Sequence, residues 1–368
     1  MWSAGGLSLG LEQSGWSPGL VLDNDYWSLS TFLYNRPGID EYCDIVLGDV
    51  TDFKVPENKQ VDLVTGGIPC QAFSNANRQR SSEDPRLHLF RPFFGIVSDM
   101  KPPLVLVENV SGFKIVESHV NNLLDELGYT HSSFVLLAQD FGVPQNRKRM
   151  FILGIKKEMF QSPESKTKLF KEILFSHRTS EQTTLRDAIS DLPPLEASRI
   201  RNKTDHENKS SGFAIAPQVA VNSSQYVKKI NQTGKSILTF NHKSRYNNDR
   251  DIEIFGLLKE GENSLAKSIQ HIMPYANRNH IFKDKYYKLK YDEISKTITA
   301  HMRWDCNMYI HPSQARGLTA REAARVQSFP DDYVFTGTFQ RLYQQIGNAV
   351  PPLLARAIGD ALMQVVKP

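Results

Sequence analysis

Short, fully apolar segments recur between residues 19 and 155, and this pattern limits the possible fold more than any other feature of the chain. Two examples are Leu104–Val107 and Met150–Ile155. A strand that is apolar on both faces has to be covered on both, as in sheets with helices on each side. Helical patterns at 89–100 and 120–127 lie between such segments. The alternation predicts an α/β fold with a doubly wound, mostly parallel sheet, whose other candidate strands are 19–22, 44–47 and 61–65.

The composition and the periodicity of the chain change after about residue 156. As far as about residue 291 the chain is richer in Lys, Asn and Ser, and its periodicity is weaker. Regular patterns return at Thr319, a predicted helix start, and at 351–366, an amphipathic helix that opens with prolines. We therefore expect two domains: residues 1–180 with 340–368 would form one, and residues 181–339 a smaller, irregular one.

Positive charge is concentrated in one stretch of the second region. Residues 199–250 hold ten lysines and arginines against three acids, although the net charge of the whole chain is only +4. Binding to a phosphate backbone requires such a concentration of charge. A solvated basic loop has the same composition, so charge alone leaves both interpretations open.

The cysteines and the apolar segments exclude several classes of protein. Cys43, Cys70 and Cys306 are widely spaced and form no Cys-x-x-Cys pair, so neither a disulfide framework nor a metal site is expected. No apolar run approaches the roughly 20 residues needed to span a bilayer, and residues 1–10 lack the features of a signal peptide. We expect a cytoplasmic protein with no membrane partner.

A thiol and a carboxyl group follow two of the predicted strands. Cys70 comes just after the strand at 61–65, in the crevice where open α/β sheets bind ligands. A lone cysteine is more often a buried, small apolar residue. Glu108, however, follows the strand Leu104–Val107 at the same edge of the sheet. Together the two groups suggest covalent catalysis with proton transfer.

A polar, basic segment precedes the last of these strands. Gln145, Arg147 and Arg149 alternate along the chain, so an extended backbone would place their side chains on one face. In isolation they would form a basic surface strand. Beside Cys70 and Glu108 they are interpreted as a substrate clamp.

Six motifs in a fixed order resemble those of the DNA cytosine-5 methyltransferases, and most of all those of the compact bacterial members of restriction-modification systems. The resemblance covers about residues 1–155 and 296–362. The motifs are Gly5-Gly-Leu-Ser-Leu-Gly10, Pro69-Cys-Gln71, Glu108-Asn-Val110, Gln145-x-Arg-x-Arg149, Arg321-Glu-Ala-Ala-Arg-Val-Gln-Ser-Phe-Pro330 and Gly347-Asn-Ala-Val-Pro-Pro352.

The resemblance implies methylation of cytosine C5 in double-stranded DNA. Cys70 would add to cytosine C6 as a thiolate, and a free thiol with a pKa of about 8.5 needs activation by its surroundings to do so. Glu108 would hold N3 and the exocyclic amine of the cytosine. Arg149 resembles the arginine that contacts O2, with Arg147 close to the covalent centre.

The resemblance also implies S-adenosylmethionine as the cofactor, without a metal. The Gly-rich loop with Gly5, Gly6 and Leu7 would let the backbone approach it closely. Asp23 would bind the ribose hydroxyls, as acidic residues do in dinucleotide sites, with Asn24 near the adenine and Asp49 accepting from its amino group. Further residues expected in this pocket are Val50, Pro69, Leu89, Asn348 and Val350.

A stacked cytosine lies out of reach of such a pocket, so the enzyme would have to flip it out of the duplex. The polar segment 74–84 resembles the mobile loop that closes over DNA. The partners implied are double-stranded DNA and a cognate restriction endonuclease, and the protein would act as a monomer. Candidate DNA contacts are Gln71, Ser74 and Arg78 in or near this loop and Lys285, Lys288, Thr299 and Arg303 in the second region.

The chain departs from the family at its first residues. The family pattern is Phe-x-Gly-x-Gly-Gly after a central strand, whereas here Met1 stands in the place of Phe and Ser3 replaces the first Gly. The sheet would thus lack its first strand and leave the neighbouring strands unpaired.

This departure keeps a catalytically impaired DNA-binding homologue open as an alternative. A transfer-RNA cytosine-5 methyltransferase is disfavoured because its Cys-Phe-Thr motif is missing. A nicotinamide oxidoreductase would explain neither Cys70 with Glu108 nor the arginine pair.

Overall fold

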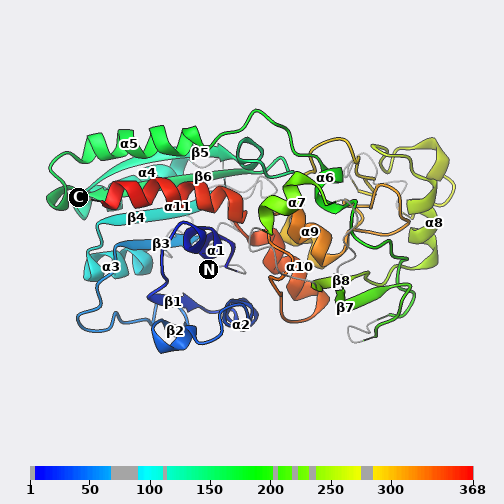
Figure 1. Ribbon diagram of the computed structural model, residues 1–368, viewed down its shortest axis with the longest axis horizontal. Helices are drawn as coiled ribbons and strands as arrows, with labels where there is room; N and C mark the ends of the chain where they lie inside the picture. Colours follow the sequence, from blue (N-terminus) through cyan, green and yellow to red (C-terminus); the bar gives the residue numbers. More distant parts are fainter. Residues whose placement is uncertain are drawn as a thin grey trace.

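The computed structural model describes residues 5–67, 90–110, 114–201, 206–217, 223–231, 238–274 and 285–367. In this part of the chain the strands form three sheets, flanked by helices (Figure 1). The strands are β1 (Leu20–Asp23), β2 (Asp44–Leu47), β3 (Leu63–Gly67), β4 (Leu104–Val110), β5 (Tyr129–Leu137), β6 (Lys148–Lys156), β7 (Gly212–Pro217) and β8 (Leu238–Lys243). The helices are α1 (Gly6–Gln13), α2 (Tyr26–Tyr34), α3 (Phe90–Met100), α4 (Lys114–Glu126), α5 (Pro163–Ser176), α6 (Leu185–Ile189), α7 (Gln225–Ile230), α8 (Asp249–Leu257), α9 (Ala320–Val326), α10 (Phe339–Asn348) and α11 (Pro352–Val366).

The central sheet has the strand order β3-β4-β6-β5. β3 and β4 are parallel, with Gly67 opposite Glu108. β6 runs antiparallel to both β4 and β5. Residues 138–147, which join β5 to β6, contain a short 3-10 helix but no crossover helix, and parallel neighbours would need one. The α/β class is confirmed. The central sheet is mixed where a mostly parallel one was predicted, with one parallel and two antiparallel pairings.

β1 and β2 form a separate parallel pair, with Asp23 opposite Leu47. Among the described residues β1 pairs only with β2, and β3 pairs only with β4. Each of these two strands therefore has an edge without a partner strand among the described residues.

The surroundings of β4 explain why its sequence is continuously apolar. Leu104 and Leu106 belong to one buried cluster, while Val105 and Val107 belong to another on the opposite face. The second cluster contains phenylalanines of α3 and Val120 and Leu124 of α4. Helices thus cover both faces of the strand, as its composition predicts.

Helices α1 and α11 pack closely against each other on the other face of the sheet (Figure 1). A Cβ atom on Gly10 would lie 2.3 Å from Cβ of Ala355, and one on Gly359 would lie 2.6 Å from Oγ of Ser14. Ser14 and Trp16 donate to the carbonyl oxygens of Arg356 and Gly359 at 2.8 Å and 3.1 Å. The two glycines permit this short distance between the helices.

The second region contains the antiparallel pair β7–β8 and short helices. Helix α9 begins at Thr319, as predicted, with a capping box between Thr319 and Glu322. The largest buried cluster includes Leu7 and Leu353 as well as Tyr226 and Ile298, so it crosses the predicted domain boundary.

The stretch Phe339–Val366 satisfies a length and hydropathy criterion for a membrane span. It consists of α10 and α11, separated at 349–351. Of the tested window, 72% is buried inside the protein, so packing in the core accounts for its apolar character.

Candidate active site

Glu108 and Arg149 meet where β4 ends and β6 begins. The antiparallel ladder places Val110 opposite Arg149, and Nε of Arg149 lies 3.0 Å from Oε1 of Glu108. Both side chains are largely buried, at 13% and 14% exposure. The two residues that the sequence placed at neighbouring strand ends therefore form a direct ion pair.

Burial raises the pKa of Glu108 above its ordinary value, and the positive charges of Arg149 and Arg147 oppose this shift without cancelling it. A carboxyl group with a raised pKa retains its proton to a higher pH. Glu108 is thus suited to sharing a proton with a ring nitrogen. The neighbouring Asn109 is buried, and its Oδ1 accepts from the backbone N–H of Val110.

Several predicted site residues lie outside the described residues. Cys70 is one of them. It follows Gly67, the last residue of β3, by three positions in the sequence. The others outside the described ranges are Pro69, Gln71, Ser74, Arg78 and Leu89.

Arg147 is fully buried just before β6. Its Nη1 donates to the carbonyl oxygen of Ile298 at 2.7 Å. Its Nη2 donates to the carbonyl oxygens of Gly347 at 3.0 Å and Ala349 at 2.7 Å. The guanidinium group therefore holds two backbone segments that are distant in sequence.

Gln145 makes a second set of buried bonds beside Arg147. Its amide donates to the carbonyl oxygen of Val326 and to Oε1 of Gln327, and its oxygen accepts from the N–H of Ile298. Gln327 donates onward to the carbonyl oxygen of Ile346 at 2.6 Å. Of the three residues predicted to share one face, only Arg149 pairs with Glu108. Gln145 and Arg147 instead bind backbone groups inside the protein.

The segment 295–299 runs alongside 144–147. The backbone N–H of Asn146 donates to the carbonyl oxygen of Ser295, and the backbone N–H of Ser295 donates to the carbonyl oxygen of Pro144, both at 2.9 Å. Thr297 Oγ1 also donates to the carbonyl oxygen of Asn146. These bonds fix the backbone that leads to Thr299.

Thr299 is held by Tyr309, a residue that the sequence did not single out. The Tyr309 hydroxyl donates to the carbonyl oxygen of Thr297 at 2.8 Å and lies 3.0 Å from Oγ1 of Thr299. Since a phenol has one proton, Thr299 is then the donor in the second bond. Nothing local in the sequence marks Tyr309, because its partners are ten or more residues away.

The remaining predicted DNA contacts differ in their surroundings. Lys288 is buried, its Nζ donates to the carbonyl oxygen of Phe255 at 2.9 Å, and burial lowers its pKa. This lysine has a structural partner inside the protein. Lys285 is partly exposed. The guanidinium of Arg303 stacks over the ring of Trp304, which is 58% exposed.

The acidic residues predicted for the cofactor gather at the ends of β1 and β2. Asp23 is buried and accepts from the N–H of Asp25 at 2.9 Å. Asn24 is exposed, and it hydrogen-bonds the exposed carboxylate of Asp49. Hydrogen bonds from Thr51, and then from Asn24, lower the pKa of Asp49, which therefore stays ionised.

The Gly-rich segment touches the turn after α10. Gly5 has a left-handed backbone with φ of 68°, and a Cβ on Gly6 would lie 2.3 Å from the carbonyl oxygen of Val350. Leu7 and Val350 are both buried in the core, while Asn348 is exposed and Val50 is partly exposed. Two of the segments predicted for the cofactor are thus in contact.

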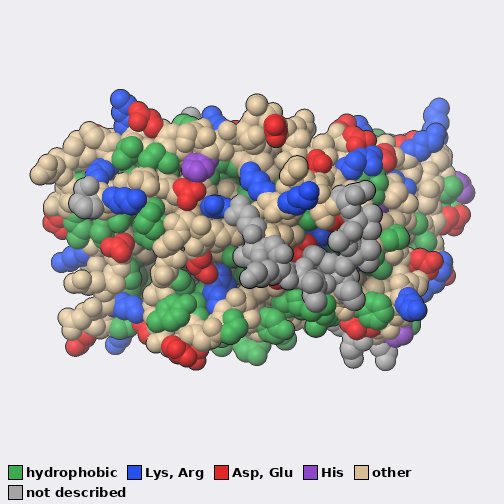
Figure 2. Space-filling view, in the orientation of Figure 1, with side chains coloured by type: hydrophobic (Ala, Val, Ile, Leu, Met, Phe, Trp, Pro, Cys, Tyr) green, Lys and Arg blue, Asp and Glu red, His purple; other side chains and the backbone are tan. Residues whose placement is uncertain are grey.

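Exposed apolar side chains surround the ends of β1 and β2. Leu47, opposite Asp23 in the ladder, is 57% exposed, and Tyr26 is 60% exposed. Figure 2 shows hydrophobic side chains gathered over β2 and α2. Neither residue was predicted to belong to the site.

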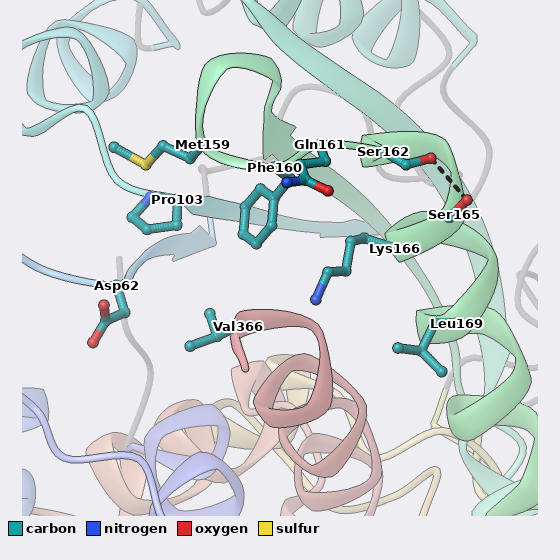
Figure 3. A pocket seen from close by; sticks show the side chains of 10 residues that line it. All are labelled: Asp62, Pro103, Met159, Phe160, Gln161, Ser162, Ser165, Lys166, Leu169 and Val366. Atoms are coloured by element: carbon teal, nitrogen blue, oxygen red, sulfur yellow. Dashed lines mark hydrogen bonds between the residues drawn. The ribbon is translucent and has the colours of Figure 1, made fainter. Parts of the chain in front are cut away.

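A separate cavity of about 750 Å³ opens where β3 and β4 begin, at the ends of these strands opposite to Glu108 (Figure 3). It is lined by Asp62 and Pro103, which precede β3 and β4, and by Phe160, Lys166 and Val366. Glu108 lies at the opposite end of β4, so this cavity is not part of the candidate site.

Comparison with known proteins gives one consistent family. The sequence profile of the C-5 cytosine-specific DNA methylases matches residues 2–364. The Type II methyltransferase M.DdeI of Desulfomicrobium norvegicum is 31% identical, over 97% of this chain and 86% of its own length. M.AgeI of Thalassovita gelatinovora is also 31% identical, over 98% and 97% of the two chains.

Solved structures show the same fold. A DNA modification methyltransferase encoded within an E. coli prophage superposes with a TM-score of 0.74 at 22% identity, covering 99% of this chain and 97% of that one. The S. pombe Dnmt2 methyltransferase has a TM-score of 0.54 at 13% identity, with coverage of 98% and 96%. With its ordered motifs, its Glu108–Arg149 pair and a family match from end to end, the chain belongs to the C-5 cytosine-specific DNA methylases and is a DNA cytosine-5 methyltransferase.

Proposed function

We propose that the enzyme methylates C5 of a cytosine flipped out of double-stranded DNA, through a covalent bond between Cys70 and cytosine C6. The ion pair between Glu108 and Arg149 carries this proposal, because it offers a proton-sharing carboxyl group and a fixed positive charge at one sheet edge. Gly67, opposite Glu108 in the β3–β4 ladder, leads to Cys70.

The residues divide the chemistry between them. The Cys70 thiolate forms a bond to C6 and moves the electron pair of the 5,6 double bond toward C5. Glu108 holds a proton at N3, and Arg149 stabilises the negative charge that develops on O2. After C5 has been methylated, a base (water serves) removes its proton. The electron pair of that C–H bond reforms the double bond and expels the Cys70 thiolate.

The residues at the other end of the site fit S-adenosylmethionine. Its polar groups would meet Asp23, Asn24 and Asp49, and the exposed Leu47 offers an apolar flank for its base. Gly6 leaves no room for a side chain beside the turn at Val350, so the backbone itself would line the pocket. When bound, the cofactor supplies an electrophilic methyl group.

The organisation of the protein follows from the same proposal. Residues 181–339 would form the target-recognition domain, and residues 1–180 with 340–368 the catalytic domain on a doubly wound sheet. The enzyme would act as a cytoplasmic monomer on a specific DNA sequence and protect it from a cognate restriction endonuclease. Lys285, Thr299 and Arg303 would contact the DNA, together with the 74–84 segment.

Trapping on 5-fluorocytosine DNA tests the proposal, because fluorine at C5 cannot leave as a proton. With S-adenosylmethionine, the wild-type enzyme should form an adduct that survives denaturation, and Cys70→Ala should form none.

Cys43→Ala is the matched control. Cys43 is buried, and burial raises its pKa to about 11, so it is a poor nucleophile and its loss should leave the adduct intact. Adduct formation by Cys70→Ala would refute the assigned nucleophile.

A further inference from the structure

We propose that Arg147 is a positioning residue that couples binding of the methyl donor to binding of DNA. This inference rests on the proposed function, because it uses the cofactor and DNA roles assigned there. It arises from one buried guanidinium that joins the turn predicted to hold the cofactor to the segment predicted to hold DNA.

The turn and the segment are in direct contact. A Cβ atom on Gly347 would lie 2.2 Å from the backbone nitrogen of Ala300 and 2.2 Å from the carbonyl carbon of Thr299. Gly347 and Asn348 are the last two residues of α10, and Ala349 and Val350 follow them; we call these four residues the cofactor turn. The carbonyl oxygen of Val350 touches Gly6. A displacement of this turn is therefore transmitted to the backbone at Thr299.

Arg147 makes this contact rigid. Nη1 holds Ile298 of the DNA segment, and Nη2 holds Gly347 and Ala349 of the cofactor turn. A guanidinium is planar and rigid, so these three bonds hold the accepting oxygens at fixed positions relative to one another. Moving either segment alone would leave a buried donor or acceptor unpaired, which is unfavourable. The two segments consequently move together or not at all.

The same group is connected to the reacting centre. Arg147 stands two residues before Arg149, which pairs with Glu108. Hydrogen bonds between 144–147 and 295–298 join the residues before β6 to the DNA segment as well. An ordered cofactor turn would thus favour the arrangement of 295–299 that binds DNA, and bound DNA would favour the cofactor turn to the same extent.

The coupling is measured as the ratio of two dissociation constants. S-adenosylhomocysteine is titrated into the enzyme alone and into the enzyme saturated with a duplex that the enzyme methylates. For wild-type enzyme we expect DNA to tighten binding by a factor in the range of about 5 to 150. Arg147→Lys keeps the charge but cannot reach three carbonyl groups, and its ratio should fall to within about twofold of one.

Arg321→Lys is the matched control. Arg321 is also fully buried and donates to three backbone carbonyl groups, those of Phe240, Pro330 and Tyr333. It touches neither Gly347 nor Ile298 through these bonds. A general loss of core packing would affect both variants, whereas the coupling should be lost only in Arg147→Lys.

Gly347→Ala provides a second variant in case Arg147→Lys does not fold. Its methyl group would force the turn away from Thr299 while Arg147 is retained, and it too should bring the ratio toward one. A wild-type ratio near one, or a ratio unchanged in Arg147→Lys, would overturn the proposal. So would an equal loss in Arg321→Lys. Methyl transfer from S-adenosylmethionine to the same duplex, measured with the same wild-type preparation in the absence of S-adenosylhomocysteine, shows separately whether the proposed function holds.

Discussion

At Glu108, burial and charge act in opposite directions on one carboxyl group. Burial raises its pKa, whereas Arg149 at 3.0 Å favours the ionised form. Because the protonated form is the one that holds N3, the rate of methyl transfer should fall as the pH rises through this raised pKa. The single-turnover rate of the wild-type enzyme, measured from pH 5 to 9, should show this descending limb.

Glu108→Gln keeps a hydrogen-bond donor but has no proton to lose. We expect the variant to be slower by roughly 100-fold or more, and its descending limb to disappear. If the rates of wild type and Glu108→Gln fell in parallel as the pH rises, another group would be responsible for the descending limb.

The arginines before and in β6 show what sequence can predict at this scale. Arg149 was expected near Glu108 through the family resemblance, which assigns both side chains to the cytosine. The two meet because β6 runs antiparallel to β4, so that the start of β6 lies beside the end of β4. The partners of Arg147 could not be predicted in this way. Ile298 and Ala349 are 151 and 202 residues away, so their proximity depends on the tertiary fold.

At the scale of elements, consecutive apolar residues decide which strands can be predicted from the sequence. All five predicted strand segments overlap an observed strand, and each contains at least two consecutive apolar residues. β5 was missed since His131, Ser132 and Ser133 interrupt its apolar residues, and all three are only partly buried. The antiparallel direction of β6 was missed as well, because direction depends on the β5–β6 connection rather than on composition.

The contact between α1 and α11 makes a prediction at this scale. Gly10→Ala would place a Cβ 2.3 Å from that of Ala355 and 2.5 Å from the carbonyl oxygen of Pro352. The helices would have to separate, which should cost about 1–3 kcal/mol in the free energy of unfolding. Urea denaturation measures this loss.

Gly95→Ala in α3 is the control, because its Cβ would meet nothing within 4 Å. Alanine has the higher helix propensity, so this variant should gain up to about 1 kcal/mol. Equal effects of the two substitutions would contradict the role given to Gly10.

For the whole molecule, a buried histidine links stability to pH. His242 of β8 lies between Thr319, 3.1 Å from its Nδ1, and the carbonyl oxygen of Pro193, 2.8 Å from its Nε2. Burial lowers the pKa of His242 to about 4, against an ordinary value of 6.5. Between these two values the unfolded chain takes up a proton that the folded protein excludes.

The free energy of unfolding should therefore decrease by up to about 3 kcal/mol as the pH falls from 6.5 to 4. His242→Gln should flatten this dependence in urea unfolding at pH 7 and pH 4.5. His301→Gln changes an exposed histidine and should leave the slope unaltered. An unchanged slope in His242→Gln would assign the pH dependence to other groups.

The hydrogen bonds between 144–147 and 295–298 also determine how specificity could be exchanged between related enzymes. A chimaera that imports a foreign recognition region together with its own version of 295–299 would have to rebuild the interface with β6 and the turn at Gly347. A junction placed before residue 295 keeps that interface native. The boundary for modular engineering thus lies inside the second region, at a set of hydrogen bonds, and does not coincide with the change in sequence composition.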